Sequence, residues 1–590
     1  MLSAACPGER PGPSTVAPQR AASPEVPSME VIVEERPDAD RWRVEYRLDA
    51  PASGLRFMRN RNRFRSAHWR VTTPAQAAWR ERDGYEELYV TTGTASARFE
   101  IEFDSMLEGL PKDYELNKAF SDGSRLLFTG HLDARPLACP SGAVCASAET
   151  TPDDGGRSMW RLATAPARWV RLLDQAGVGE LSWSPSTELS EQGTYVYFGN
   201  IEPLESEHLV AIIDPGMPAW IREETASTLP ALFRYYTAEV DVELSRKPLL
   251  LLSFGGFERP GRSSGGGVLH GLVELSIEGQ GFREPSPEGR QQWQTTLAHE
   301  VFHLWNGQRF FIDLGPHEEW LSEGSAEYFA RRALLALGAV DEQGFQRAVV
   351  EAANACLAQI SGRPLLEPPL RFGSFYPCGM TLMAWADGAA RHADADIGDV
   401  FAAVFAAAAR RETARYSTYD FLEQLERVSG HPLATGPIVR VLRVGVATGA
   451  SGFFARQLHE AGIPVTAVEP GQATLGRWDF ERLLGKHLVR CDCASDAPVR
   501  HRGGAVEIEA SEACTLARDG ARVTHIEGHS VSAESAAALQ ALLARTRAGE
   551  PVTVRGDDGE RLLRCRDDGV DRSFVELFRP ALSPGAARRE

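Results

Sequence analysis

The sequence predicts an α+β multidomain protein, and three observations lead to that prediction. Residues 29–205 alternate between apolar and polar side chains, residues 220–428 contain helical runs rich in alanine and leucine, and residues 493–580 return to a β-rich pattern. Alternation with a period of two is typical of strands that bury one face, whereas apolar residues three and four apart are typical of amphipathic helices. A chain of 590 residues is also too long for a single hydrophobic core.

These patterns divide the chain into five parts. We expect a disordered leader or signal remnant, an N-terminal β-sandwich domain, a central domain with a helical bundle, a connector, and a C-terminal β-rich domain, at residues 1–28, 29–205, 206–435, 436–492 and 493–580 respectively. The leader is rich in Pro, Ala, Ser and Glu, and Leu2-Ser-Ala-Ala-Cys6 loosely resembles the end of a bacterial lipoprotein signal.

Composition excludes two classes of partner. The formal charge is -18 and the arginines are interspersed with acids, so no basic stripe for nucleic acid is expected. Apolar runs stay well below the roughly 18 residues that cross a bilayer, and we expect no integral membrane span.

Eight cysteines follow Cys6, and they leave two interpretations open. An even number with close pairs fits disulfides, an oxidising compartment and a periplasmic or secreted protein, with or without a lipid anchor. Eight reduced or buried cysteines in a cytoplasmic protein are the alternative. These cysteines are Cys139, Cys145, Cys356, Cys378, Cys491, Cys493, Cys514 and Cys565.

The N-terminal part reads as antiparallel strands. Trp42, Val44 and Tyr46 alternate with charged residues, as do Phe99 and Ile101, and Gly, Pro and Asp separate such runs. One buried face per strand indicates a sandwich. We find no catalytic constellation there, and we interpret its histidines, His68 and His131, as surface or structural residues.

The central part begins with a predicted helix at 220–236, followed by a β run at 249–254, a Gly-rich loop (Gly265-Gly-Gly267) and a second β-prone run at 268–277. This order predicts an edge strand with which an extended peptide can pair, beside the helix that comes next. Beyond Gly324, helices are expected at 326–337, 345–360, 381–391, 397–411 and 418–428.

The last part contains a glycine-rich stretch and a small β unit. Gly445-Val-Ala-Thr-Gly449-Ala-Ser-Gly452 lacks a βαβ context and a downstream acid, so we interpret it as a turn-rich connector rather than a dinucleotide loop. Strands are expected at 506–508, 523–526 and 552–554, and a helix at 533–545.

The chemistry of the chain centres on His299-Glu300-Val-Phe-His303. On a helix, His299 and His303 lie one turn apart on one face and can direct two imidazole nitrogens at a single zinc ion. Glu300 cannot share that face, but it can accept a proton from water that zinc has activated. The spacing therefore predicts a zinc site with Glu300 as general base, and hence a metallopeptidase.

A catalytic zinc site needs a third protein ligand and an open position. We choose Glu323, because Trp320 and Leu321 precede it as buried anchors and it begins a helix that can dock on the first. Glu327 lies one turn further on and can accept the second ring N–H of His299 or His303, unless it is only an exposed helix acid. Three other residues compete with Glu323 as the third ligand, but we interpret them as part of a solvated loop: His317, Glu318 and Glu319.

These motifs resemble the glycyl aminopeptidase family of zinc metallopeptidases, which is similar to the larger family of alanyl-type aminopeptidases. The matching residues are His299 to Gly307, Trp320-Leu-Ser-Glu323-Gly324, and Phe375-Tyr376-Pro-Cys378-Gly379. The resemblance implies an N-terminal β domain, a thermolysin-like catalytic domain with a helical portion, and a C-terminal PDZ-like domain, whose strand and turn would be residues 519–531. It also nominates Tyr376 as the oxyanion donor, against a packed aromatic in a helical turn.

Two positions depart from the family. Gly266, Gly267, Val268 and Leu269 stand where the family binds substrate, and Leu269 replaces the glutamate that holds a free α-amino group. Cys378 replaces a lysine, which implies either an altered substrate pocket or a disulfide with Cys356.

The sequence thus predicts a zinc peptidase with one zinc ion, aminopeptidase-like, acting on small or unfolded peptides. Leucine cannot pair with an ammonium group, so an endopeptidase with the same site is an alternative. A third possibility is a non-catalytic zinc-containing scaffold that binds peptide ends through its PDZ-like domain.

Overall fold

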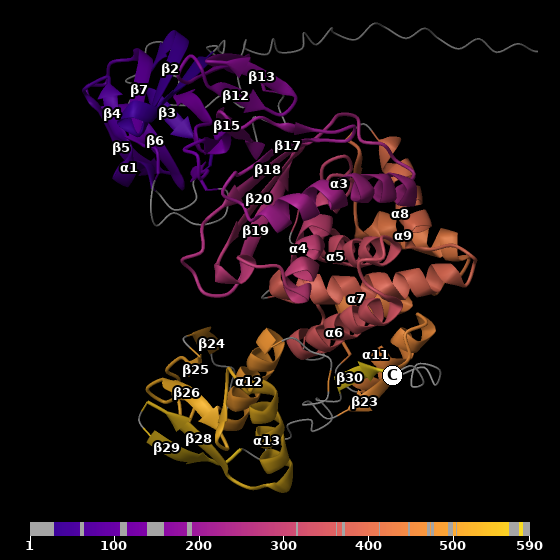
Figure 1. The fold of residues 1–590 in the computed structure, drawn as a ribbon. Coiled ribbons are helices and arrows are strands. Elements are labelled where there is room, and N and C mark those ends of the chain that lie inside the picture. The colour runs from indigo at the N-terminus through magenta and orange to yellow at the C-terminus, as the bar shows by residue number, and fades with distance from the viewer. Residues whose placement is uncertain are drawn as a thin grey trace, which may run out of the picture. The chain divides into compact units, whose positions relative to one another are not determined.

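The computed structural model describes residues 29–581, except for 60–63, 107–114, 138–157, 186–191, 314, 316, 361–362, 369–371, 412, 447–448, 469–472, 474–476, 494–498, 503, 558 and 566–576. The chain forms two compact units: the first runs up to Asn200, and the second starts at Ile201 and also includes Phe120–Asp122 (Figure 1). The expected leader, Cys139 and Cys145 lie outside the described residues.

The first unit is built from three sheets. Nearly all of its strand pairs are antiparallel, as the alternation predicts, but β1 pairs with β11 in parallel. The sheets, in strand order, are β14 (Glu180–Trp183), β11 (Ser158–Ala163), β1 (Met29–Arg36), β2 (Arg41–Ala52), β7 (Ser96–Asp104), β4 (Arg70–Thr73); then β10 (Ala134–Leu137), β3 (Gly54–Phe57), β6 (Tyr85–Val90), β5 (Ala77–Arg82); then β13 (Gln175–Val178), β12 (Trp169–Leu172), β15 (Tyr195–Gly199), β9 (Arg125–Phe128), β8 (Asn117–Ala119). The short helix α1 spans Arg65–His68.

The second unit opens with a five-stranded mixed sheet. Its order is β16 (Leu204–Glu205), β17 (Val210–Ile213), β18 (Leu249–Phe254), β20 (Leu272–Glu278) and β19 (Ser263–Leu269), with β17, β18 and β20 parallel and β19 an antiparallel edge. The expected Gly-rich loop is wrong, because Gly265-Gly-Gly267 lies inside β19. The chain turns instead at His270 and Gly271, where Gly271 adopts a φ of 71° that favours glycine.

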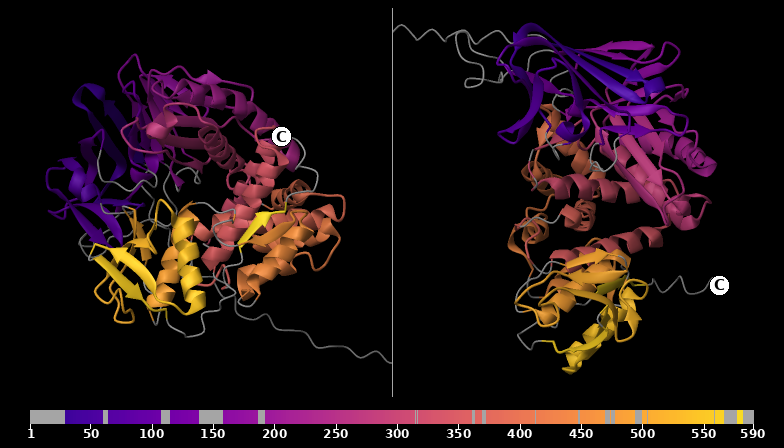
Figure 2. Two further views of the ribbon diagram at one scale, coloured as in Figure 1. Left: turned by 60° about the horizontal axis from the view of Figure 1, so that its bottom comes forward. Right: turned by 90° about the vertical axis from the view of Figure 1, so that its left-hand side faces the viewer.

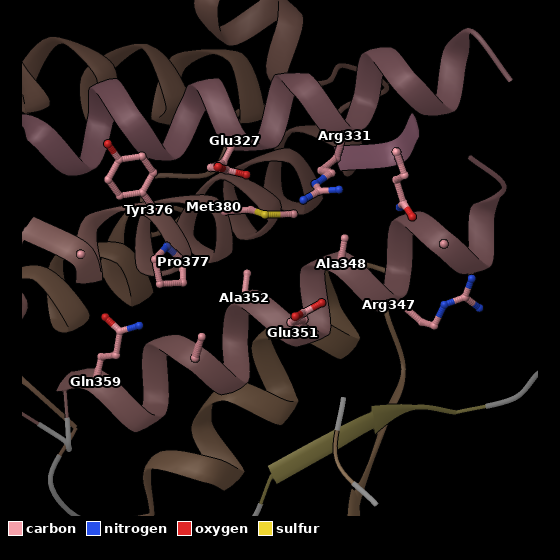
Figure 3. Close-up of a pocket in the computed structure, with 14 residues that line it drawn as sticks. Glu327, Arg331, Arg347, Ala348, Glu351, Ala352, Gln359, Tyr376, Pro377 and Met380 are labelled. Atoms are coloured by element: carbon pink, nitrogen blue, oxygen red, sulfur yellow. The ribbon is translucent and has the colours of Figure 1, made fainter. Parts of the chain in front are cut away.

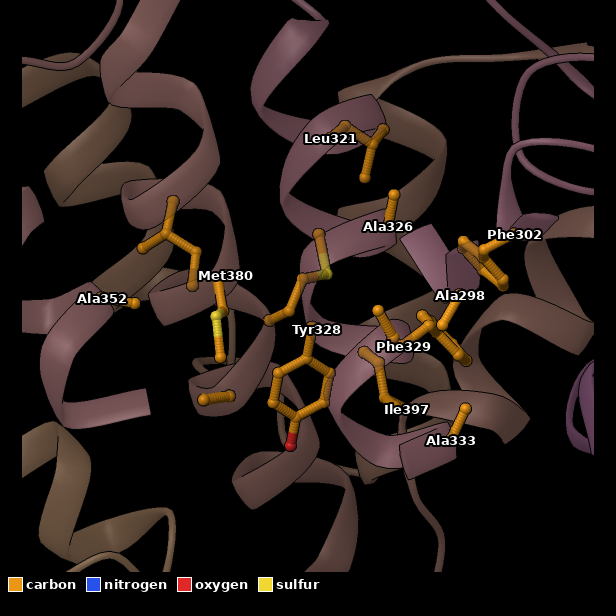
Figure 4. Close-up of a cluster of buried hydrophobic side chains, with 14 of the residues drawn as sticks. Ala298, Phe302, Leu321, Ala326, Tyr328, Phe329, Ala333, Ala352, Met380 and Ile397 are labelled. Carbon is orange, nitrogen blue, oxygen red and sulfur yellow. The ribbon is translucent and has the colours of Figure 1, made fainter. Parts of the chain in front are cut away.

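Seven helices share one large buried core with this sheet: α3 (Ala219–Val240), α4 (Pro287–Phe302), α5 (Glu319–Ala336), α6 (Glu342–Ile360), α7 (Phe372–Arg391), α8 (Ile397–Ala409) and α9 (Thr418–Ser429). Val273, Leu275 and Ile277 of β20 join their large core, whereas Glu274 points to the other face. Figure 4 shows how Ala298 and Phe302 of α4 face Phe329 of α5 within that core.

Two helices are longer than expected at their N-termini. Helix α5 begins at Glu319, four residues before Glu323, so Trp320 and Leu321 are buried within the helix. Helix α7 begins at Phe372 rather than near Thr381, because packing outweighs the poor helix propensity of Pro377 and its neighbouring glycines.

The segment expected as a connector contains helices: α10 (Gly436–Val439), a π-helical turn at Arg440–Val444, α11 (Ala450–Glu460), strand β23 (Val465–Val468) and α12 (Arg477–Asp492). The final strand β30 (Leu577–Pro580) pairs with β23. Two short strands, β21 (Phe311–Ile312) and β22 (Arg415–Tyr416), pair in parallel.

A small β unit follows. Its sheet order is β24 (Val499–Arg502), β25 (Ala505–Ile508), β26 (Ala521–Ile526), β28 (Val552–Gly556) and β29 (Gly559–Leu563), with β27 (His529–Ser530) paired to β26. Helices α12 and α13 (Ser535–Ala548) lie together on one side of this sheet (Figure 1, Figure 2).

Three disulfides join described cysteines: Cys356–Cys378, Cys491–Cys565 and Cys493–Cys514. The first is the pair that the departure from the family implied. Within the described part of the chain, no helix is both long and apolar enough to cross a membrane.

Candidate metal centre

The histidine helix is α4, and its sequence defines where it starts. Ser286 caps the helix by accepting a hydrogen bond from the Gly289 N–H, and Pro287 occupies the first turn. His299 then lies in the last turn and His303 at the C-cap position. Both imidazoles are largely buried, and their Nε2 atoms lie 3.2 Å apart.

Helix α5 brings Glu323 to the same point. Glu323 Oε2 lies 3.2 Å from His299 Nε2 and 3.6 Å from His303 Nε2. Donor atoms about 2.0–2.1 Å from a tetrahedral zinc ion lie roughly 3.3 Å from one another. The separations of these three atoms therefore fit one zinc ion, and the two neutral nitrogens with one carboxylate oxygen are a zinc-type donor set.

The second ring nitrogen of each histidine, Nδ1, also lies near an oxygen atom. Glu327 Oε1 lies 3.5 Å from His299 Nδ1, and the carbonyl oxygen of Asn306 lies 3.2 Å from His303 Nδ1. With protons assigned to both Nδ1 atoms, each Nε2 lone pair is left to point at the metal position.

Asn306 is itself fixed by a buried network. Its side chain donates to Ser325 of α5 and accepts from the hydroxyl of Tyr416 in β22. Sequence reasoning missed this network, because Tyr416 lies far along the chain and only packing brings it to Asn306.

The charges of the site are mutually stabilising. Burial opposes ionisation of Glu323, but His303 and His299 hold the pKa of its carboxyl well below its usual range. Burial likewise disfavours a charged His299, yet Glu323 and Glu327 raise its pKa above the ordinary value. The carboxylates around the two imidazoles therefore favour a positive charge at this position, and a bound cation would supply one.

Glu300 and Tyr376 flank these ligands. Glu300 is half-buried, and its charge acts on His299, His303 and Tyr376. The Tyr376 ring lies nearly parallel to that of His299, with ring centroids 6.0 Å apart, and 41% of the residue is exposed. Burial and then the Glu323 charge raise the pKa of Tyr376, so its hydroxyl stays protonated and able to donate at neutral pH.

The competing ligands lie elsewhere, and the solvated loop expected for them is only partly correct. His317 is exposed, but Glu318 accepts hydrogen bonds from the Thr418 N–H and hydroxyl at 2.7 and 2.6 Å. Glu318 therefore binds the first residue of α9, and Glu319 is the first residue of α5. A second group of potential ligands, Asp492 with Cys493 and Cys514, contains a disulfide instead.

The glycine-rich edge strand β19 contacts α4. Gly266 is exposed, Gly267 and Val268 are half-buried, and Leu269 is buried. Gln308, which follows the histidine motif, donates to the Val268 carbonyl at 3.3 Å. An edge strand is thus present beside the histidine helix, but it is β19, whereas most of the β run expected at 268–277 is the inner strand β20.

Comparisons with known proteins give one clear result. No family model and no curated protein matches the chain. Among solved structures, the chain is similar to the crystal structure of an aminopeptidase N family protein from Idiomarina loihiensis, with a TM-score of 0.61, 12% identity, and coverage of 91% of this chain and 95% of that one. The chain has that protein's fold.

Proposed function

We propose that this protein is a zinc-dependent peptidase, aminopeptidase-like in its catalytic apparatus. The observation that supports the proposal most is the convergence of His299, His303 and Glu323 at separations of 3.2 to 3.6 Å, with Glu300 and Tyr376 beside them. A structural zinc site has no need of the last two groups, because its coordination is closed.

The chemistry follows from these residues. When bound, zinc supplies Lewis-acid activation of water and of the scissile carbonyl. Glu300 accepts the proton that the attacking water loses and transfers it to the leaving amine. Tyr376 donates a hydrogen bond to the carbonyl oxygen as it gains negative charge. Gly266, Gly267 and Val268 offer backbone groups along the edge strand for an extended peptide.

Specificity for a free N-terminus is the less supported part. Leu269 is buried and apolar, so it provides no partner for an ammonium group. We therefore propose peptides as substrates and leave both end-directed and internal cleavage within the proposal.

The alternative role, binding of peptide ends by a PDZ-like domain, has less support. Such binding adds a strand at a sheet edge beside a helix. Here α12 contacts both β24 and α13, and its Leu484 and Leu488 share a buried cluster with Leu539 and Leu542. A peptide would have to displace α12. The disulfides favour a periplasmic or secreted location as part of this proposal.

The decisive experiment uses a peptide library in free and N-acetylated form with the zinc-loaded protein. We expect hydrolysis that Glu300→Gln lowers by a factor of about 10³ or more while one zinc ion per chain is retained. Loss of activity on the acetylated set alone indicates an aminopeptidase, and retention indicates an endopeptidase. Unchanged hydrolysis by Glu300→Gln would contradict catalysis at this site.

A further inference from the structure

A cavity of about 530 Å³ opens beside Tyr376, and the proposed chemistry does not use it. Helix α5 forms one wall and α6 the facing wall, with Tyr376 and Pro377 of α7 at one end (Figure 3). Its size falls within the range of small-molecule and side-chain pockets. Tyr376, the proposed oxyanion donor, lines this cavity. A substrate residue next to the scissile bond can therefore reach the cavity.

The apolar surface of the cavity comes from Ala348, Ala352 and Met380, and its polar surface carries four charges. Three of these have partners. Glu327 is paired with His299, Glu351 has a partner of its own, and Arg347 is 56% exposed at its side chain and lies 4.0 Å from Asp341.

Arg331 differs in that it forms no salt bridge with a carboxylate of the described residues. It projects from α5 one turn beyond Glu327 and lines the cavity. Its Nη1 donates to Thr295 Oγ1 at 3.1 Å and its charge acts on Glu327, but its buried Nε has no hydrogen-bond partner among the described residues. A guanidinium on a cavity wall that makes no salt bridge with the described residues can bind a carboxylate through charge-assisted hydrogen bonds.

We propose that this cavity holds a substrate residue adjoining the scissile bond and that Arg331 selects a carboxylate there. The inference rests on the proposed peptidase function. The carboxylate is that of an aspartate or glutamate side chain, or the α-carboxylate of a substrate's last residue, since both present the same two oxygens to Arg331.

The test uses the zinc-loaded full chain and one cleavable peptide in four forms: glutamate or glutamine at the position that flanks the cleaved bond, each as the free acid and as the C-terminal amide. We expect wild-type kcat/KM to be about tenfold higher for the peptides that carry the recognised carboxylate than for the peptides in which an amide replaces it. A preference for glutamate over glutamine in both the free acid and the amide identifies the side-chain carboxylate. A lower kcat/KM for the amide than for the free acid identifies the α-carboxylate.

Arg331→Gln should abolish this preference while keeping the rate on the neutral peptide, and Arg331→Lys should keep part of it, because one charge remains without the bidentate geometry. Arg456→Gln, at an exposed arginine of α11, is the matched control and should change nothing.

Equal rates on all four peptides, a preference for the glutamine amide, or an unchanged preference in Arg331→Gln would overturn the inference and leave the proposed function standing. A uniform loss on all peptides in both Arg331 variants would also overturn it, since Arg331 would then only support Glu327. A wild-type protein without any peptide hydrolysis would overturn both proposals.

Discussion

Replacement of Gly324 by alanine is expected to disable the metal centre without removing any polar group. Gly324 of α5 and Gly379 of α7 face each other across the helix contact. A Cβ at Gly324 would lie far inside contact distance of the Gly379 Cα and 3.0 Å from the Met380 nitrogen. Both neighbours are backbone atoms, so no side chain can move aside to make room.

The size of the effect follows from this contact. Heavy atoms need about 3.5–4.0 Å, so α5 and α7 must separate by roughly 1 Å or more. Glu323 belongs to one helix and Tyr376 to the other, so the separation changes their relative position. A misplacement of about 1 Å can cost about 100-fold in rate, and overpacking typically costs about 1–3 kcal/mol of stability.

The assay combines kcat/KM on a cleaved peptide with thermal unfolding of the zinc-loaded chain. The matched control is Gly452→Ala, a glycine within α11 at which the added Cβ meets only Arg456 Nη1 at 3.9 Å. That control should keep full activity and gain up to about 1 kcal/mol from helix propensity. A Gly324→Ala protein with wild-type activity and unfolding temperature would refute the reasoning.

Three further predictions concern single polar groups. Glu327→Gln should weaken zinc binding about 10- to 100-fold in a chelator competition, because His299 loses its charged Nδ1 partner; unchanged affinity would contradict that role. Tyr376→Phe keeps the ring beside His299 but should lower kcat about 100- to 1000-fold with unchanged zinc affinity, and a small drop would assign the oxyanion to another donor. Arg43 donates to Glu100 at 2.7 Å and lowers the pKa of that carboxyl to about 2. Since the folded pKa is depressed, this stabilisation is present above pH 4.5 and lost as the pH falls towards 2. Glu100→Gln should cost about 1 kcal/mol at pH 7, because solvent screens the pair, and little near pH 2, measured by hydrogen exchange of β2 and β7.

Local rules were sufficient for one part of the site. The spacing of His299 and His303 follows from helix periodicity, and the i, i+4 spacing of Glu323 and Glu327 places both on one face of the next helix. The pattern also predicts an edge strand near Val268, but not its residues. Glycine is depleted in strands, so Gly265 to Gly267 indicate a loop, whereas their backbone lies in β19 and pairs with β20 at the sheet edge.

Non-local contacts decided what the sequence left open. The spacing of eight cysteines does not determine which of them form disulfides. In the fold, α6 packs against α7, and this packing brings Cys356 and Cys378 together. Other contacts between distant segments form the cavity lined by Arg331, bring Tyr416 to Asn306, and cover the C-terminal sheet with α12.

By itself, the sequence determined the ligand types, the helix that holds two of them, and the absence of an acid at Leu269. Those features depend on residue identity and on helix geometry, which act over a few residues. Tertiary structure decided that Glu323 meets the two histidines at zinc-compatible distances and that Gly324 meets Gly379 closely enough to allow it. Such distances depend on how helices far apart in the chain pack, and no local spacing encodes them.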